Sequence, residues 1–147
     1  MLFKSLVAGL AVAVLSVGSA YAAECALPAD ATSGKTVSNK CKSCHVFEAD
    51  KASRPTGPNL HDIYGDKAGV RKDYPKYSEA LTAASNKGLT WTDEKLSDYL
   101  ADPKAFLAGV TGNPELKHGM FFNLKDEQGR KDVIAYLKGI KGKPECN

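Results

Sequence analysis

Hydrophobic and polar positions along the first half of the chain predict one short helix followed by a long irregular segment. The helix is expected from Gly34 to Cys44. The next stretch, 46–76, contains six glycine and proline residues, at positions 55, 57, 58, 65, 69 and 75, which exclude long regular elements. This part is therefore expected to be a loop whose shape depends on something other than backbone hydrogen-bond ladders.

Apolar residues recur at helical spacing in the second half, where Leu96, Tyr99 and Leu100 mark one face and Val133, Ile134 and Leu137 another. No strand alternation and no internal repeat is present, so the pattern predicts a small all-α domain. Helices are expected at 78–86, from a Thr92 cap to Pro103, and at 126–139, with one further turn at 103–109 and an irregular loop at 109–123.

The first 23 residues have the pattern of a secretory signal. Lys4 precedes an apolar run from Leu6 to Val17, and the segment closes with the small-x-small sequence Ala-Tyr-Ala that signal peptidase recognises. A retained membrane anchor is the weaker alternative, because the run is shorter than the roughly 20 residues that cross a bilayer. A lipid on Cys25 is disfavoured, because Glu24 stands where lipoprotein signals need a small residue. We expect cleavage after residue 23.

Length and charge fit one domain in an exported protein. The chain has 147 residues, 43% hydrophobic and 25% charged, which suffices for one compact domain at 24–147. Loss of the signal removes one lysine and no acid, which leaves 19 basic and 17 acidic residues and a charge of +2. No basic run is present, so nucleic acid is not an expected partner. The expected location is the periplasm or the cell exterior, without stable membrane insertion.

The strongest chemical signal is a cysteine pair followed directly by a histidine, at Cys41, Cys44 and His45. Thioredoxin-like, zinc and haem sites all use C-x-x-C. The βαβ surroundings of a thioredoxin are absent, and the other cysteines, Cys25 and Cys146, do not have zinc-site spacing. In C-x-x-C-H, two thiols one helical turn apart can add to the vinyl groups of haem, and the imidazole then lies beneath the iron. One covalently attached haem c is predicted.

The second axial ligand is sought among the residue types that complete a haem. Met1 leaves with the signal, so Met120 is the only methionine of the mature chain. It could instead be an ordinary core methionine, since methionine often fills gaps. His118 is the rival ligand and would give a bis-histidine haem of lower potential. His61 is expected either at the surface or beside a residue that binds the haem.

Six stretches occur in the order typical of a known family: CKSCH, TGPNLHDIYGDKAG, GLTW, LSDYLADPKAF, HGMFF and DVIAYLKGI. They resemble class I cytochromes c over nearly all of 32–140. The long loop from Pro103 to Met120 and the interval from Tyr77 to Trp91 are closer to the soluble bacterial c-two subgroup than to the mitochondrial form. The resemblance implies a class I cytochrome c fold, in which short helices and long loops wrap around one covalent haem.

The resemblance also implies roles for individual residues. Cys41 and Cys44 would carry the thioethers, and His45 and Met120 would bind iron. The Pro58 carbonyl would accept a hydrogen bond from the histidine, which orients the ring and raises its basicity. Three aromatic residues, each of which could instead be plain core, would contact the cofactor: Tyr99 beside the methionine sulfur, and Tyr77 and Trp91 at a haem propionate.

Two positions depart from the family pattern. Many relatives have an arginine that neutralises the inner propionate where this chain has Asp66. Relatives also show a glycine followed four residues later by an aromatic that packs on the last helix, whereas this chain has Gly34 and then Ser38. Propionate electrostatics therefore cannot be carried over, and the contact between the terminal helices is expected to be thin.

The predicted chemistry favours a diffusible one-electron carrier over an enzyme. An iron with two protein ligands has no open site for substrate, and a methionine ligand raises the potential relative to two histidines. The expected protein is a periplasmic monomer that shuttles electrons between respiratory or photosynthetic redox proteins. These partners would dock at the haem edge, where lysines could steer an acidic surface. The lysines near haem-binding segments are Lys40, Lys42, Lys104 and Lys117.

Two other functions remain open. A dedicated haem subunit bound to a periplasmic dehydrogenase would keep a larger apolar patch for persistent association. An enzyme or gas sensor would need a labile Met120. Donor, acceptor, pathway and potential are not encoded in any motif.

Cys25 and Cys146 remain after haem takes the other two cysteines. An even pair in an oxidising compartment is usually bridged, and the family fold brings the first and last helices together. An intramolecular disulfide is predicted. Free thiols and a bridge between two molecules are the alternatives.

Overall fold

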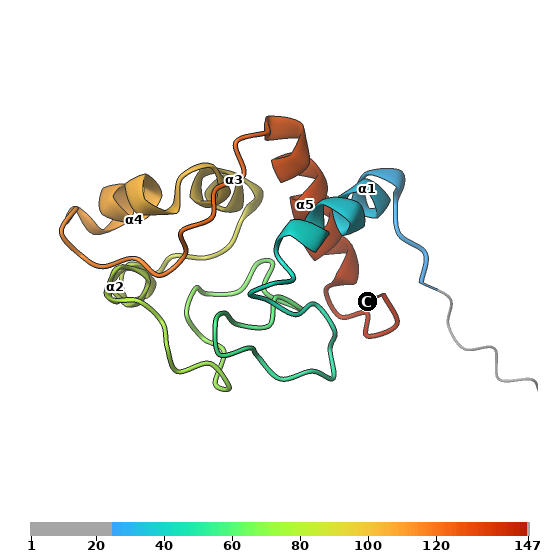
Figure 1. Cartoon of the computed structure of the whole chain (residues 1–147), viewed down its shortest axis with the longest axis horizontal. Coiled ribbons are helices and arrows are strands. Elements are labelled where there is room, and N and C mark those ends of the chain that lie inside the picture. Colours follow the sequence, from blue (N-terminus) through green and yellow to red (C-terminus); the bar gives the residue numbers. More distant parts are fainter. Residues whose placement is uncertain (1–24, 147) are drawn as a thin grey trace, which may run out of the picture.

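The computed structural model describes residues 25–146, and the predicted signal peptide lies outside this range. None of the helices in this part of the chain is both long and apolar enough to span a membrane. Apart from two isolated β-bridges, the regular elements of residues 25–146 are helices. They are α1 (Ala29–Val37), the 3-10 helix η1 (Ser38–Lys40), α2 (Glu79–Asn86), α3 (Asp93–Ala101), α4 (Pro103–Thr111) and α5 (Glu127–Ile140). Figure 1 shows α1 crossing α5 at one end, α2 and α4 at the other, and the long loop after η1 below them.

The crossing of α1 and α5 depends on a glycine. A Cβ atom built at Gly34 would lie 1.8 Å from the carbonyl oxygen of Asp132 and 2.8 Å from the Cβ of Tyr136. The two backbones therefore touch, and this is the most extensive contact between helices in the described residues. The thin contact expected from Ser38 is wrong. Ser38 is fully buried, its hydroxyl donates to the Lys35 carbonyl, and Phe47 supplies the aromatic partner, with its ring centroid 5.7 Å from that of Tyr136.

Side-chain caps start the later helices where the sequence predicts them. Ser78, Thr92 and Asp126 each accept a hydrogen bond from a backbone amide three residues ahead, at 3.3, 3.3 and 2.9 Å. Two predictions differ from the structure in their bounds. The turn expected at 103–109 is the full helix α4, capped by Asp102 and ended at Gly112 with φ 71°. The first helix was predicted too late in the chain: α1 begins at Ala29, five residues before Gly34, and ends at Val37 instead of Cys44, with η1 after it.

Hydrogen bonds between loop segments replace regular structure in 46–76, as expected. The Asn59 side chain is buried and donates to the carbonyls of Glu48 and Lys51, at 2.7 Å each. The Leu60 amide donates to the Val46 carbonyl at 2.8 Å, and the Ala68 amide donates to the Leu89 carbonyl at 2.8 Å. The loop is thus anchored along its length, and the apolar core runs from it to α3, α4 and α5.

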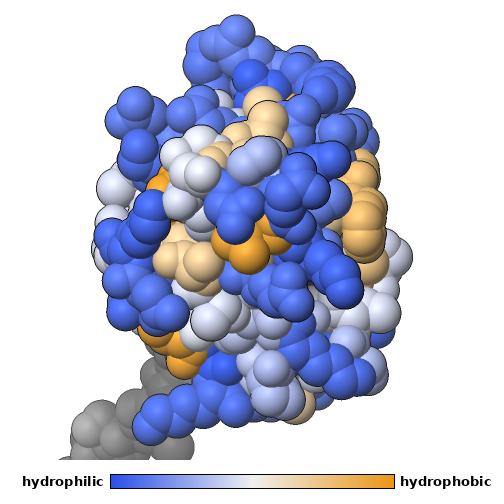
Figure 2. All heavy atoms as spheres, turned by 90° about the vertical axis from the view of Figure 1, so that its left-hand side faces the viewer, coloured by the Kyte–Doolittle hydropathy of each residue, from blue (hydrophilic) through white to orange (hydrophobic). Residues whose placement is uncertain are grey.

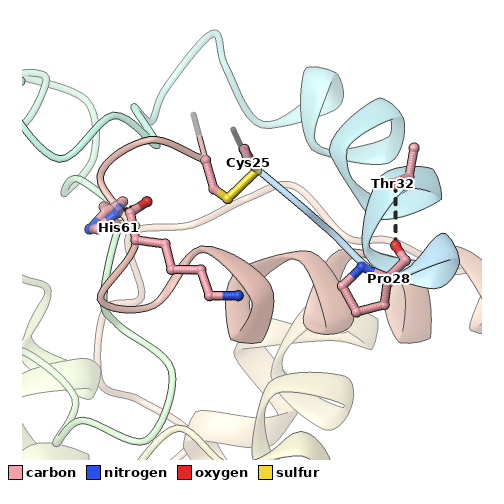
Figure 3. The surroundings of a disulfide bond; sticks show 6 residues. Cys25, Pro28, Thr32 and His61 are labelled. Carbon is pink, nitrogen blue, oxygen red and sulfur yellow. Dashed lines mark hydrogen bonds between the residues drawn. A yellow bond between two sulfur atoms is a disulfide. The ribbon is translucent and has the colours of Figure 1, made fainter. Parts of the chain in front are cut away.

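The predicted disulfide is confirmed: Cys25 and Cys146 are bonded across 121 residues of sequence. Figure 3 shows this bond with His61 beside it. The expectation of a surface position for His61 is wrong, because the residue is 2% exposed. Its Nδ1 lies 2.8 Å from a carboxylate oxygen of Asp62, and its Nε2 lies 3.4 Å from the Lys143 carbonyl oxygen. His61 therefore belongs to the contact between the long loop and the C-terminal segment.

Candidate haem site

One cavity of about 340 Å³ collects every residue that the sequence assigns to the cofactor. A volume of this size is typical of ligand pockets, which occupy about 300–1,000 Å³. Its wall also includes apolar side chains from α2, α3 and α5, such as Leu81, Leu96 and Val133. The predicted residues in the lining are Cys41, Cys44, His45, Pro58, Tyr77, Trp91, Tyr99 and Met120.

The cysteine pair lies on a helical turn that continues η1. The Cys41 amide donates to the Ser38 carbonyl at 2.9 Å, and the His45 amide donates to the Cys41 carbonyl at 2.9 Å. This turn places both thiols and the imidazole on the cavity wall. Both cysteines are free in the polypeptide. Burial raises the pKa of the Cys41 thiol, nearby Cys44 raises it further, and Lys40 opposes the shift.

His45 is held in the form that a metal ligand requires. Its Nδ1 lies 2.8 Å from the Pro58 carbonyl oxygen, which can only accept a hydrogen bond, so this nitrogen carries the proton. Burial lowers the pKa of His45, and the bond to Pro58 offsets part of that shift. The ring is therefore neutral, with its lone pair on Nε2.

Gly57 lets the loop approach the histidine ring. A Cβ atom at this position would lie 2.6 Å from His45 Cε1 and 2.8 Å from the Cys44 carbonyl oxygen. The hydroxyl of Thr56 donates to that same carbonyl at 3.1 Å. The segment before Pro58 thus packs directly on the C-x-x-C-H turn, and only glycine leaves room for it.

Aromatic rings form a continuous part of the wall. The Tyr99 and Trp91 rings both line the cavity, with centroids 5.0 Å apart, and Phe106 packs against Tyr99 from outside the lining at 5.8 Å. Burial raises the pKa of Tyr99, and burial also raises that of Tyr77, whose oxygen accepts a hydrogen bond from the Arg71 amide at 3.2 Å. Both phenols are therefore protonated at neutral pH.

Charged groups in the lining are mostly cationic. Four basic residues line the cavity, at Lys40, Lys67, Arg71 and Lys76, and Asp66 is its only carboxylate among the described residues. Of the four lysines expected to steer partners, Lys40 is in this wall, whereas Lys42, Lys104 and Lys117 are not. The exposed large apolar residues Val70, Phe121 and Phe122 also belong to the lining.

Several residues that shape the site were missed from the sequence. Gly57 and Asn59 act through close approach and backbone carbonyls, and Arg71 donates through Nε to the Asn59 carbonyl at 3.1 Å and also to the His61 carbonyl. Gly57 and Asn59 lie in the stretch TGPNL, whose glycine and proline residues predict a loop but assign no role to either residue. His118 does not line the cavity, and its ring lies 4.8 Å from that of Phe121.

These features fit a haem c: two free thiols, a neutral imidazole and a thioether share one apolar cavity. The family model for cytochrome c matches residues 31–141. The chain belongs to the cytochrome c family. As such, it carries one covalently attached haem c and transfers electrons without substrate turnover of its own.

Named relatives place the chain beside bacterial cytochromes c2. It is 41% identical to cytochrome c2 of Rhodospirillum rubrum over 136 residues, which covers 92% of this chain and 96% of that protein. It is 44% identical to cytochrome c2 iso-1 of Rhodospirillum centenum over 115 residues, with coverage of 74% and 94%. The predicted c-two-like identity is confirmed.

Solved structures agree with the class I cytochrome c fold. Cytochrome c2 of Rhodobacter sphaeroides superposes with a TM-score of 0.70 at 37% identity, covering 76% of this chain and 95% of that one. Cytochrome c2 of Rhodospirillum centenum also gives 0.70 at 37% identity, with coverage of 76% and 98%. The relatives favour the electron carrier over the dehydrogenase subunit.

Proposed function

We propose that the protein is a periplasmic electron shuttle in which His45 and Met120 bind the haem iron and Cys41 and Cys44 hold the macrocycle. The observation that carries this proposal is the single cavity whose wall contains all four residues. When bound, haem c supplies an iron that takes up and releases one electron. Cleavage of a signal peptide at residue 23 would place the protein in the periplasm.

The protein's own groups keep the iron site closed and its geometry constant. The Pro58 carbonyl fixes the imidazole tautomer, and Gly57 seats the loop against the ring. Tyr99 and Trp91 line the cavity, and their rings would exclude water from the iron when haem is bound. A neutral imidazole and a thioether change neither charge nor proton count during electron transfer, so little reorganisation is required.

Partner docking is proposed at the mouth of the cavity. The three exposed apolar side chains there, Val70, Phe121 and Phe122, are 48%, 80% and 40% exposed. Together with the four cations of the wall they suit a brief contact with an acidic redox protein. On the face drawn in Figure 2, apolar residues form small separate patches among hydrophilic ones. On that face, no broad apolar surface is present for persistent association, which agrees with the proposed brief contact.

The ligation is tested by spectroscopy of the oxidised protein. The sulfur-to-iron charge-transfer band at the red end of the visible spectrum should be present in wild type and absent in Met120→Ala. Met120→His should retain haem at a lower potential. His118→Ala is the matched control and should keep the band. A band that survives in Met120→Ala would rule out the methionine as ligand.

The docking surface is tested with ferricyanide, a small anionic oxidant, as the probe. Lys40→Gln should slow oxidation of the ferrous protein at low salt, and added salt should remove the difference. Lys131→Gln is the control, because Lys131 pairs with Glu127 at 2.7 Å and does not line the cavity. Equal slowing by both variants would contradict a cationic surface at the mouth.

A further inference from the structure

Asp66 places a negative charge in the wall of the haem cavity. It is the only carboxylate there among the described residues. Its backbone is fixed, because its carbonyl accepts from the Trp91 amide at 2.9 Å and the Gly65 amide donates to the Trp91 carbonyl at 2.8 Å. An uncompensated negative charge at this point would stabilise ferric over ferrous iron, since the ferric site carries one more positive charge.

Lys141 supplies the opposite charge from outside the cavity. Its Nζ lies 3.0 Å from Asp66 Oδ1 and also donates to the Tyr64 carbonyl. Lys141 follows the last residue of α5 and does not line the cavity. The cation that compensates the wall carboxylate is therefore delivered by the C-terminal segment 141–146.

The C-terminal segment is held against the loop by contacts that do not involve Asp66. The Gly142 amide donates to Asp62 Oδ1 at 2.5 Å, and the His61 ring lies 3.4 Å from the Lys143 carbonyl oxygen. Asp62 is the only described non-glycine residue with positive φ, at 65°, and its second oxygen contacts His61 Nδ1 at 2.8 Å. The disulfide from Cys146 to Cys25 closes this arrangement beside His61 (Figure 3).

We propose that Lys141 is a positioning residue for the haem potential: it neutralises Asp66 in the cavity wall, and the docked C-terminal segment keeps it there. The proposal rests on the proposed function only in requiring haem in this cavity. Asp66 and Lys141 are 46% and 40% exposed as side chains, so solvent screens the effect.

Spectroelectrochemical titration of the holoprotein tests the proposal. Lys141→Gln leaves Asp66 unpaired, so the equilibrium constant for one-electron reduction should fall by about two- to fivefold, the range of an exposed ion pair. Asp66→Asn should raise that constant by a similar factor. The double variant should return close to wild type, because removal of both charges leaves the same net charge near the haem as the intact pair. Added salt should shrink both shifts.

Lys138→Gln is the matched control. Lys138 lies in the last turn of α5, three residues before Lys141, and pairs with Asp93 at 2.9 Å, but neither Lys138 nor Asp93 lines the cavity. This variant loses the same charge and should shift the potential by less than half as much as Lys141→Gln. Equal shifts in the two lysine variants, or an unchanged potential in Asp66→Asn, would overturn the proposal.

The charge-transfer band and urea unfolding distinguish failure of this proposal from wrong ligation and from a purely structural role of Lys141. If the proposed ligation is wrong, wild type lacks the charge-transfer band before any variant is compared. If Lys141 merely stabilises the fold, urea unfolding shows lower stability in Lys141→Gln, and the potential does not recover when Asp66→Asn is added. Recovery of the potential in the double variant therefore supports an electrostatic role of Lys141 and contradicts a purely structural role.

Discussion

At the scale of single residues, Gly57 is the position where one methyl group disturbs the site most directly. Gly57→Ala would place a carbon 2.6 Å from His45 Cε1 and 2.8 Å from the Cys44 carbonyl oxygen. We expect a loss of about 1–3 kcal/mol in the free energy of unfolding, as for other overpacked sites, and a shifted charge-transfer band because the ring must move. Urea unfolding and the visible spectrum measure the two effects. Unchanged values for both would show that the loop yields without cost.

Asp93 gives a pH-dependent prediction. The hydrogen bond from Lys138 lowers the pKa of Asp93, and the bond from the Tyr64 hydroxyl lowers it further. A carboxyl group with a depressed pKa stabilises the folded state above its unfolded pKa, and this contribution disappears as the pH falls through the folded value. Asp93→Asn should therefore cost at most about 1 kcal/mol at neutral pH, since the pair is exposed.

The pH dependence of the stability loss in Asp93→Asn tests this prediction. The difference between wild type and Asp93→Asn should vanish below the depressed pKa, in unfolding experiments that compare neutral with acidic solution. Glu94→Gln is a control at the neighbouring position of α3. A difference that persists in acid would mean that the amide disturbs the helix rather than removing a charge interaction.

Residue chemistry explains which parts of the site were predictable. That the cysteine pair, His45 and Met120 share this cavity could be predicted, because few residue types can attach or ligate haem, and each stands in a distinctive motif or is the only one left. Arg71 and Asn59 could not, because their partners are backbone carbonyls that meet only when the loop closes. The compensation of Asp66 by Lys141 spans 75 residues and leaves no local pattern.

At the scale of elements, the helices with side-chain caps and apolar periodicity were predicted close to their bounds. The start of α1 was not, because its buried face consists of Ala31 and Gly34, which have little hydrophobic signal. Small residues are required there, since a Cβ at Gly139 of α5 would lie 2.9 Å from Leu27 and 3.3 Å from Ala31. Close backbone contact thus replaces the large side chains on which hydrophobic patterns depend.

The same close contact yields a prediction for the α1–α5 crossing. Gly34→Ala forces a carbon to within 1.8 Å of the Asp132 carbonyl oxygen, which is backbone and cannot rotate away. We expect the helices to separate and the free energy of unfolding to fall by about 1–3 kcal/mol or more. Urea unfolding of the holoprotein followed by circular dichroism measures the loss.

Gly109 in α4 provides the matched control for that substitution. No atom lies within 4 Å of a Cβ built there, so Gly109→Ala should stabilise the protein by about 0.5–1 kcal/mol through better helix propensity. Opposite signs for two glycine-to-alanine changes in helices would separate packing from propensity. A stabilising Gly34→Ala would show that the crossing can relax.

At the scale of the whole molecule, the haem cavity and the disulfide hold the chain together at different points. The cavity joins the C-x-x-C-H turn, the long loop and α2, α3 and α5. The disulfide joins the segment before α1 to the segment after α5. The two constraints overlap only in part, because the proposed haem attachment at Cys41 and Cys44 would leave both chain ends unconstrained in the unfolded state.

Removal of the disulfide should therefore lower stability without removing the haem. A bridge across 121 residues restricts the unfolded chain by about 4–5 kcal/mol in the entropy model, less the part already restricted by haem attachment. The Cys25→Ser and Cys146→Ser double variant should unfold at lower urea with a steeper denaturant dependence, because its unfolded state is more expanded. Its charge-transfer band should persist, since neither Cys25 nor Cys146 lines the cavity.

Reduced wild type should match the double variant in urea. The reduction should add about two hydrogens per monomer to the intact mass without dissociating a dimer. Equal urea midpoints for oxidised and reduced protein would show that the bond does not stabilise the fold.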